Sequence, residues 1–285
     1  MKILIVGSEG QLGRGLVAAS PSRAKIVGHD IDTLDITDAT LIEAVVAEIR
    51  PEIIFNAAAY TAVDRAERDE AAALAVNATA VGHLAKAARS VGASFVHVST
   101  DFVFDGMSGV PYSPGAETAP LGVYGRTKLA GEKAAGEDAL IVRTAWVYAP
   151  IGGNFVRTML RLMGERSEVR VVSDQIGTPT YAPGLAAALW TLAERGAKGI
   201  YHYTDAGACS WYDFAVAIQE EALSVGLLEK SVPVIPINAS EYPTPAKRPH
   251  FSVLDKASTF ALLGSPTPHW RVNLRKMLAE IAQQA

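Results

Sequence analysis

The chain has 285 residues, of which 49% are hydrophobic and 20% charged, close to the averages of soluble globular proteins. Its net charge of −4, without clustered Lys and Arg, argues against nucleic acid as a partner. One cysteine, Cys209, excludes an internal disulfide, the six histidines lack zinc-site spacing, and no apolar run suits a signal peptide or membrane span. We therefore expect a cytoplasmic protein.

Short apolar runs alternate with alanine-rich segments of helical periodicity along the first half of the chain. The runs predict strands at residues 2–6, 25–30, 51–56, 93–99 and 139–144. The segments between them predict helices at residues 10–20, 38–50, 67–91 and 124–136. This alternation is typical of βα units around a parallel sheet that is covered on both faces. The predicted fold class is α/β, a doubly wound, Rossmann-like parallel sheet.

After about Trp146 the rhythm loosens, because turn-rich segments at 149–154, 174–184 and 241–250 interrupt shorter elements. We predict a dinucleotide-binding part at residues 1–147 and a smaller, mainly substrate-binding part at residues 148–285. Neither a repeat nor an obvious linker separates the two parts. We therefore expect elements of the second part to return to the sheet.

Three glycines, Gly7, Gly10 and Gly13, directly follow the first predicted strand and open the first predicted helix. Glycines in this context let the backbone approach a pyrophosphate, whose charge is met by free N–H groups and the positive end of the helix. The spacing is G-x-x-G-x-x-G rather than the usual G-x-G-x-x-G. The context nevertheless favours a dinucleotide site.

Acidic residues after the second predicted strand fit the same site. Asp30 is placed to accept hydrogen bonds from an adenosine ribose, and its charge would repel a 2′-phosphate. Asp35 and Ile36 are placed to flank an adenine ring. Each acid could also be an ordinary solvated loop charge. The preference between NADH and NADPH stays open.

Tyr124 and Lys128 lie four residues apart in a predicted helix, so their side chains share one face. Pairs at this spacing are often ordinary packing pairs. The neighbouring segments decide between packing and chemistry.

Six ordered segments resemble the extended short-chain dehydrogenase/reductase family when they are taken with the glycine-rich turn. They are residues 56–67, 99–106, 123–132, 143–148, 174–180 and 242–249. Within that family they are most similar to the subgroup that reduces the C4 keto group of dTDP-4-dehydro-L-rhamnose to give dTDP-L-rhamnose. The resemblance implies NADPH or NADH as cofactor and a nucleotide-sugar substrate.

Reduction of a ketone requires the residue types that this resemblance identifies as catalytic. Hydride arrival leaves charge on oxygen, so the site needs a proton donor and a hydrogen-bond donor. We predict Tyr124 as the acid, with its pKa brought closer to neutrality by the ammonium of Lys128, which also reaches the nicotinamide ribose. Thr100, at the end of the fourth predicted strand, would bind the substrate oxygen, although such a residue can merely cap a turn.

The resemblance implies further contacts. It assigns to the cofactor, besides the residues above, Gln11, Leu12, Ala57, Ala58, Ala59 and Asn77. It assigns to the sugar nucleotide Asp64, Glu67, Asp101, Phe102, Trp146, Asn154, Gln175 and Arg248, with Thr178 and Thr180 in matching segments. Trp146 would stack on the sugar or line its pocket, and Arg248 would clamp the diphosphate. The alternatives are a core tryptophan, an exposed arginine and, for Asn77, a buried structural amide.

Other activities remain open on the same fold. Phe102 stands where many relatives carry tyrosine, and Tyr60 where some carry histidine. A related 4-ketoreductase, a 4-epimerase or a 4,6-dehydratase is an alternative, although dehydratases carry an acid where this chain has Phe102. A catalytically silent subunit is another alternative, against which Thr100, Tyr124 and Lys128 argue. Magnesium is left open because no carboxylate cluster marks its ligands, as is the choice between monomer and homodimer.

Overall fold

A single parallel sheet forms the centre of the protein, whose computed structural model describes residues 1–284. Residue 285, the last of the predicted second part, lies outside the described residues. The strand order is β10-β5-β4-β3-β1-β2, and every pairing is parallel. The strands are β1 (Lys2–Val6), β2 (Lys25–His29), β3 (Ile53–Asn56), β4 (Ser94–Thr100), β5 (Leu140–Thr144) and β10 (Gly199–His202). The predicted α/β class is confirmed.

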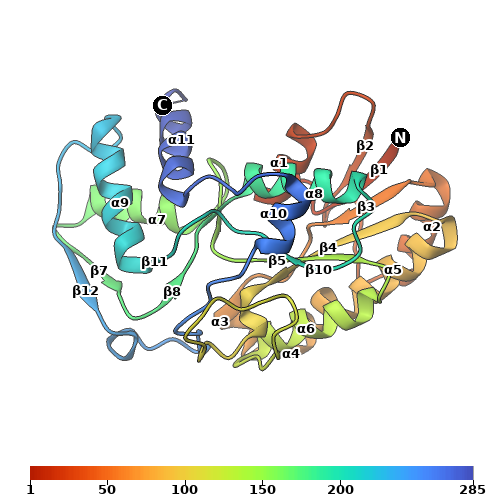
Figure 1. Cartoon of the computed structure of the whole chain (residues 1–285), viewed down its shortest axis with the longest axis horizontal. Helices are drawn as coiled ribbons and strands as arrows, with labels where there is room; N and C mark the ends of the chain where they lie inside the picture. Colours follow the sequence, from red (N-terminus) through yellow and green to blue (C-terminus); the bar gives the residue numbers. More distant parts are fainter. Residues whose placement is uncertain (285) are drawn as a thin grey trace.

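Helices cover both faces of this sheet (Figure 1). They are α1 (Gln11–Ala18), α2 (Ala39–Ile49), α5 (Ala80–Val91), α6 (Val123–Ala135) and α8 (Ala182–Glu194). Side chains alternate along a strand, so Ile3 and Ile5 of β1 pack with α1 and α8, while Leu4 and Val6 pack with α2 and α5. Both faces are therefore buried, which explains why the strands are almost continuously apolar.

The predicted helix at 67–91 is helical from Glu70 to Val91 and contains one π-helical turn. A short helix α3 (Val63–Ala66) precedes it, and it consists of α4 (Glu70–Leu74), one π-helical turn (Ala75–Thr79) and α5. In the π turn, the Asn77 side chain accepts a hydrogen bond from the Tyr60 N–H at 2.9 Å and donates to the Tyr60 carbonyl at 3.1 Å. It also donates to Thr127 Oγ1 of α6 at 3.2 Å. The predicted helix is therefore present from Glu70 to Val91, and its π turn stands where this residue ties three segments together.

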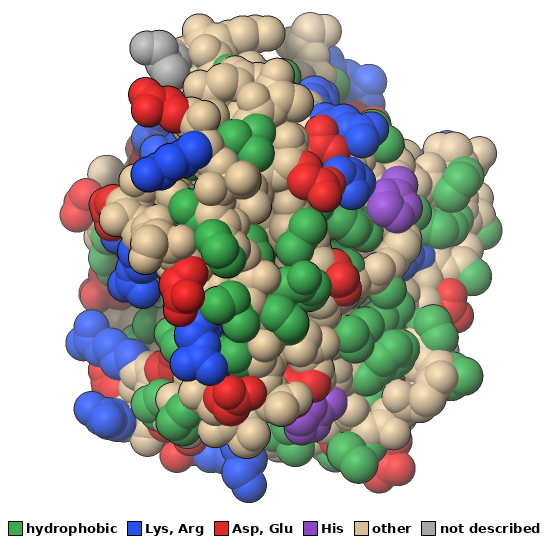
Figure 2. All heavy atoms as spheres, turned by 90° about the vertical axis from the view of Figure 1, so that its left-hand side faces the viewer, with side chains coloured by type: hydrophobic (Ala, Val, Ile, Leu, Met, Phe, Trp, Pro, Cys, Tyr) green, Lys and Arg blue, Asp and Glu red, His purple; other side chains and the backbone are tan. Residues whose placement is uncertain are grey.

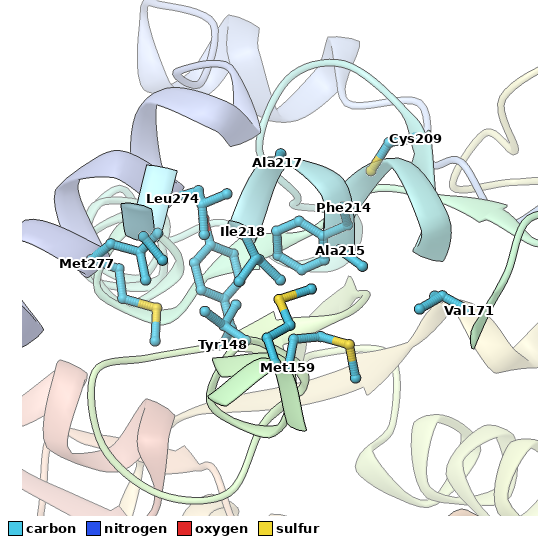
Figure 3. Packing of buried hydrophobic residues seen from close by; sticks show 14 of the residues in the cluster. Tyr148, Met159, Val171, Cys209, Phe214, Ala215, Ala217, Ile218, Leu274 and Met277 are labelled. Atoms are coloured by element: carbon cyan, nitrogen blue, oxygen red, sulfur yellow. The ribbon is translucent and has the colours of Figure 1, made fainter. Parts of the chain in front are cut away.

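A second core lies beyond the sheet, at the left of Figure 1. Helices α7 (Phe155–Glu165), α9 (Trp211–Ser224) and α11 (Trp270–Ala282) pack around side chains such as Tyr148 and Phe214 (Figure 3). The remaining elements are β6 (Val147–Tyr148), β7 (Val169–Val172), β8 (Ile176–Gly177), β9 (Thr180–Tyr181), β11 (Cys209–Ser210), β12 (Val234–Ile237), α10 (Ala257–Leu263) and the 3₁₀ turns Asp101–Val103 and Ala239–Glu241.

The chain passes between the two cores more than once. After β9 it returns through α8, which packs on α1, and through β10, which pairs with β5 at the sheet edge. The division of function between residues 1–147 and 148–285 stays a prediction.

The face of the molecule turned to the viewer in Figure 2 mixes acidic, basic and hydrophobic side chains. On the second core, α9 and α11 are joined by ion pairs from Glu221 to Arg271 and Arg275. Within residues 1–284, no helix has the length and apolar character needed to cross a membrane.

Two glycines on neighbouring helices provide a test of how closely α6 is packed. A β-carbon on Gly131 of α6 would stand 2.0 Å from the Asn77 carbonyl oxygen, whereas one on Gly82 of α5 would meet Ala134 Cβ at 3.5 Å, an ordinary contact. Gly131→Ala should lower the free energy of unfolding by about 1–3 kcal/mol, because α6 must move away from the π turn. Gly82→Ala should be neutral or raise it by up to about 1 kcal/mol. Denaturant unfolding measures both, and equal stability of the two variants would contradict the close packing.

Candidate active site

A cavity of about 1320 Å³ opens where β1, β3 and β4 end, next to the point where the strand order reverses between β1 and β3. The predicted residues that line it are Gly7, Gly10, Gln11, Leu12, Asp30, Asp35, Ile36, Ala57, Ala58, Ala59, Thr100, Asp101, Phe102, Tyr124, Lys128, Trp146 and Arg248. The fold thus brings segments of both predicted parts to one continuous space.

Other predicted residues lie behind this lining or beside it. They are Gly13, Asp64, Glu67, Asn77, Asn154, Gln175, Thr178 and Thr180. In the described part of the chain, most of them bond to or pack against other protein groups.

The glycine-rich turn is shaped by close backbone contacts. Gly7 has a φ of +77°, and a β-carbon there would stand 2.7 Å from the Ala58 nitrogen. A β-carbon on Gly13 would stand 2.0 Å from the Gly7 carbonyl oxygen, so Gly13 lets α1 pack on the turn rather than facing the cavity. Gly10 caps α1 without any side-chain hydrogen bond. The N–H groups of the first turn are therefore available to an anion in the cavity.

Asp30 stands at the end of β2, on the cavity rim. Its Oδ2 accepts the Glu9 N–H at 2.9 Å and its Oδ1 accepts the Ile31 N–H at 2.8 Å, which fixes the carboxylate against the glycine-rich turn. Each oxygen retains capacity for a further hydrogen bond. Nearby, Asp35 Oδ1 accepts two hydrogen bonds from Thr37, which lower the pKa of Asp35.

Tyr124, Thr100 and Lys128 meet where α6 crosses the end of β4. The Lys128 ammonium donates to the Val98 carbonyl at 2.7 Å. Thr100 follows two residues later on the same strand, and its hydroxyl lies close enough to the Tyr124 phenol to lower the pKa of Tyr124. The Tyr124 ring also meets the edge of Phe102, with ring centroids 5.5 Å apart.

The electrostatics of this group differ from the prediction. Burial raises the pKa of Tyr124 to about 12, and the charge of Asp101 adds to the rise while the hydrogen bond with Thr100 opposes it. Burial lowers the pKa of Lys128 to about 8. The prediction that Lys128 brings the phenol close to neutrality is wrong for this structure, because loss of solvent dominates both groups. At neutral pH Tyr124 therefore carries its proton.

Asp101 is a second acid in the cavity, and its side chain is almost fully buried. Burial raises the pKa of Asp101 to about 6, although the nearby Ser252 and Thr100 hydroxyls oppose the rise. Thr100 Oγ1 lies 3.0 Å from its Oδ1, while its Oδ2 has no hydrogen-bond partner within residues 1–284. This carboxyl group therefore keeps one buried oxygen whose hydrogen-bonding capacity the described residues leave unused.

A stacked tryptophan pair also lines the cavity. Trp146 and Trp211 lie with ring centroids 3.4 Å apart and planes 9° apart. Trp146 holds a left-handed backbone with φ of +48°, and its indole packs against the Gly177 backbone, where a β-carbon would stand 2.7 Å from Cε2. The sequence did not predict Trp211. The Ser210–Asp213 capping box marks the helix that starts there, but no local signal shows where that helix docks.

Asp64 and Arg248 were predicted as separate ligand contacts, but they bind each other. Arg248 Nη2 donates to Asp64 Oδ2 at 2.8 Å and Arg248 Nη1 to Asp64 Oδ1 at 3.2 Å. The pair lowers the pKa of Asp64. Glu67 accepts the Val123 N–H at 2.8 Å, so it caps the first turn of α6, the helix that carries Tyr124. These residues position elements of the site.

Four further predicted contacts have structural roles or buried positions. Asn154 caps α7 and donates to Gln11 Oε1 at 2.9 Å, so it holds a side chain of the glycine-rich turn. Gln175 is buried just before β8. Thr178 and Thr180 are fully buried, and their hydroxyls bond to the Gly207 carbonyl and to Thr144. These hydroxyls are used within the protein.

A metal centre is not evident in the described residues. Among residues 1–284, no group of three His, Cys, Asp or Glu side chains is placed to hold an ion.

Comparison with known proteins gives a consistent result over the whole chain. The family model described as RmlD substrate binding domain matches residues 1–283. A dTDP-4-dehydrorhamnose reductase of Burkholderia thailandensis is 43% identical over 298 aligned residues, covering 100% of both proteins.

Two solved structures are also similar. A dTDP-4-dehydrorhamnose reductase of Clostridium acetobutylicum superposes with a TM-score of 0.92 at 38% identity, covering 99% of both chains. That of Bacillus anthracis, in complex with NADP, has a TM-score of 0.92 at 38% identity and covers 98% of this chain and 99% of its own.

The buried acid Asp101 leads to a prediction about stability and pH. Its pKa is raised in the folded state, so the folded protein binds the proton more tightly and loses stability as pH rises from about 4 to about 6. Asp101→Asn should therefore gain stability relative to the unmodified protein over this range, by up to about 3 kcal/mol. Denaturant unfolding at pH 4 and pH 7 measures the gain.

Asp105→Asn is the matched control. Tyr112 donates to Asp105 at 2.6 Å and lowers the pKa of Asp105, so this variant should lose stability relative to the unmodified protein as pH rises. If the free energy of unfolding of Asp101→Asn differs from that of the unmodified protein by the same amount at both pH values, Asp101 is not a desolvated acid.

Proposed function

The chain belongs to the family of the RmlD substrate binding domain, and we propose that it catalyses the reaction of the dTDP-4-dehydrorhamnose reductases. In that reaction NADPH or NADH reduces the C4 keto group of dTDP-4-dehydro-L-rhamnose, and the product is dTDP-L-rhamnose. The observation that carries the proposal is the meeting of Tyr124, Thr100 and Lys128 on the same cavity as the glycine-rich turn. Sequence identity of 42–43% over nearly the whole chain to reductases of this name supports it.

The residues present fit a nicotinamide dinucleotide. The uncapped first turn of α1 offers N–H groups to a diphosphate, and Gly7 lets the turn lie directly against the Ala58 backbone at the cavity wall. Asp30 would accept hydrogen bonds from the adenosine ribose, and Asp35 and Ile36 would border the adenine. When bound, the cofactor supplies the hydride.

Tyr124 acts as the proton donor to the substrate oxygen in this proposal. Since it carries its proton at neutral pH, it is in the form that an acid requires. The Thr100 hydroxyl, beside the phenol, would orient the same oxygen by turning its proton from Asp101 toward the substrate. The Lys128 ammonium, fixed by the Val98 carbonyl, stabilises the phenolate that proton transfer leaves behind.

The sugar nucleotide would occupy the side of the cavity bounded by Asp101, Phe102 and the Trp146–Trp211 pair. The free Oδ2 of Asp101 suits a sugar hydroxyl, and Arg248, although paired with Asp64, keeps a quarter of its side chain exposed beside the cavity. We accordingly propose residues 1–147, with α8 and β10, as the cofactor part and the rest of residues 148–284 as mainly the substrate part.

An assay of NADPH and NADH oxidation with dTDP- and UDP-linked 4-keto sugars tests this function. Oxidation of about one cofactor per product with the dTDP-linked 4-keto-6-deoxysugar is expected, because a reductase exchanges its cofactor in every cycle. Tightly retained NAD with no net oxidation would instead support the epimerase or dehydratase alternative. Inactivity with every sugar, despite cofactor binding, would support a silent subunit.

Tyr124→Phe removes only a hydroxyl, so folding and cofactor binding should be nearly unchanged. The turnover number should fall by roughly 10²–10⁴-fold, the usual contribution of general acid catalysis. Lys128→Met should instead weaken cofactor binding and turnover together, because it removes a ribose contact and the charge beside the phenol. Steady-state kinetics and cofactor titration separate the two effects. Near-normal turnover of Tyr124→Phe would exclude it as the acid.

Asp30→Ala tests whether Asp30 recognises the adenosine ribose. The carboxylate should favour NADH through the ribose hydroxyls and oppose NADPH through charge, so the variant should weaken NADH more than NADPH, by about 1–2 kcal/mol. Cofactor titrations by fluorescence give both affinities. Equal losses of affinity for NADH and NADPH would mean that Asp30 does not distinguish the two riboses.

A further inference from the structure

A buried ion pair lies beneath the candidate catalytic group. Glu132 of α6 is paired with Arg143 of β5 through two parallel contacts, Nε to Oε1 at 2.8 Å and Nη2 to Oε2 at 2.7 Å. Their side chains are only 4% and 3% exposed. The Ser99 hydroxyl adds a third hydrogen bond to Glu132 Oε1 at 2.5 Å. Both carboxylate oxygens of Glu132 are thus satisfied by fixed donors.

This pair does not touch the cavity, and stability is a poor reason for it. Removing two charges from water costs several kcal/mol per ion, and hydrophobic replacements of similar volume are often neutral or stabilising. Arg143 also bonds the Pro114 carbonyl and lies over the Phe104 ring. The fixed negative charge of Glu132 can instead influence the pKa values of titratable groups close to it.

The nearest functional neighbour of Glu132 is Lys128, one helical turn before it on the same helix. Lys128 is bonded to the Val98 carbonyl, and Glu132 to the hydroxyl of Ser99, the next residue of β4. Thr100, which meets Tyr124, comes directly after these two. Two side chains one turn apart therefore fix the register of α6 on the last three residues of β4.

Charged and titratable groups from α6, β4 and β5 act on Lys128 or on the groups beside it. They are Tyr124 and Glu132 on α6, His97 on β4, Asp101 after β4 and Arg143 on β5. Burial, with the charge of Lys128, lowers the pKa of His97 well below its usual value, so this imidazole is neutral. Arg143 is paired with Glu132, and the charge of Asp101 acts on Tyr124. Glu132 supplies the negative charge that holds the proton on Lys128.

We propose that Glu132 is a positioning residue of this active site, which keeps Lys128 charged and holds Lys128 and Tyr124 in register with the end of β4. This role rests on the proposed function, in which the ammonium of Lys128 binds cofactor and stabilises the phenolate. Arg143 and Ser99 hold the Glu132 carboxylate in place.

This role of Glu132 predicts that the pKa of Lys128 falls when the Glu132 charge is removed. Burial lowers the pKa of Lys128 to about 8, and the charge of Glu132 opposes that drop. Without this charge Lys128 loses its proton at a lower pH, since nothing compensates for burial. The alkaline limb of the rate profile and of cofactor binding should both move to lower pH.

The double variant Glu132→Gln/Arg143→Met removes both charges and leaves no unpaired buried ion. The alkaline limb of kcat/KM for the cofactor should lie at lower pH than that of the unmodified protein, with the loss of the Arg143 charge reducing the shift. NADPH affinity, followed by fluorescence across the same pH range, should shift equally and requires no sugar. Glu221→Gln is the control, because Glu221 is also held by two arginines but lies on α9. It should leave both limbs unchanged.

Glu132→Asp tests the positioning role separately and does not depend on the double variant folding. It keeps the charge but shortens the side chain, so the alkaline limb should stay in place while kcat falls by about tenfold to a hundredfold. A folded double variant with unshifted limbs, or Glu132→Asp with normal kcat, would overturn the proposal. If the unmodified protein binds NADPH but turns over no keto sugar, the proposed function fails, while the shift in NADPH binding still tests Glu132.

Discussion

The candidate active site depends on how closely α6 approaches the segments around the end of β4. A β-carbon on Gly125 would stand 2.2 Å from the Phe102 carbonyl oxygen, and one on Gly131 would stand 2.0 Å from that of Asn77. At these two positions only a glycine lets the helix lie against the neighbouring backbone. With the helix in this place, Lys128 reaches the Val98 carbonyl and Tyr124 reaches Thr100. The Glu67 carboxylate at its first turn and the Asn77 amide at its middle hold it there.

The same close packing shifts the pKa values of Tyr124, Lys128 and Asp101. Because α6 excludes water from the end of β4, the phenol keeps its proton, the ammonium binds its proton less tightly, and Asp101 becomes a weak acid. These groups line the same cavity as the uncapped turn of α1 and the stacked tryptophans. A protonated acid, a nearby cation and an anion site on one cavity are the arrangement that reduction of a nucleotide-linked ketone requires.

Much of this arrangement could be predicted from the sequence, because it follows from local patterns. Apolar runs and helical periodicity identified five strands of the sheet, and four-residue spacing placed Tyr124 and Lys128 on one face. Features that depend on distant segments could not be predicted in this way. Asp64 and Arg248 were assigned to different ligand groups, yet they meet across 184 residues. The π turn at Asn77, the docking of Trp211 on Trp146 and the Glu132–Arg143 pair likewise form only when separate elements pack.

Transfer of a labelled hydride tests the central claim most directly. The protein would be incubated with dTDP-4-dehydro-L-rhamnose and NADPH that is deuterated at both C4 positions of the nicotinamide, and the product analysed by NMR and mass spectrometry. The account predicts dTDP-L-rhamnose with one deuterium per molecule, located at C4 of the sugar. Unlabelled product, an epimerised 4-keto sugar, or unchanged substrate with a protein that binds NADPH would contradict it.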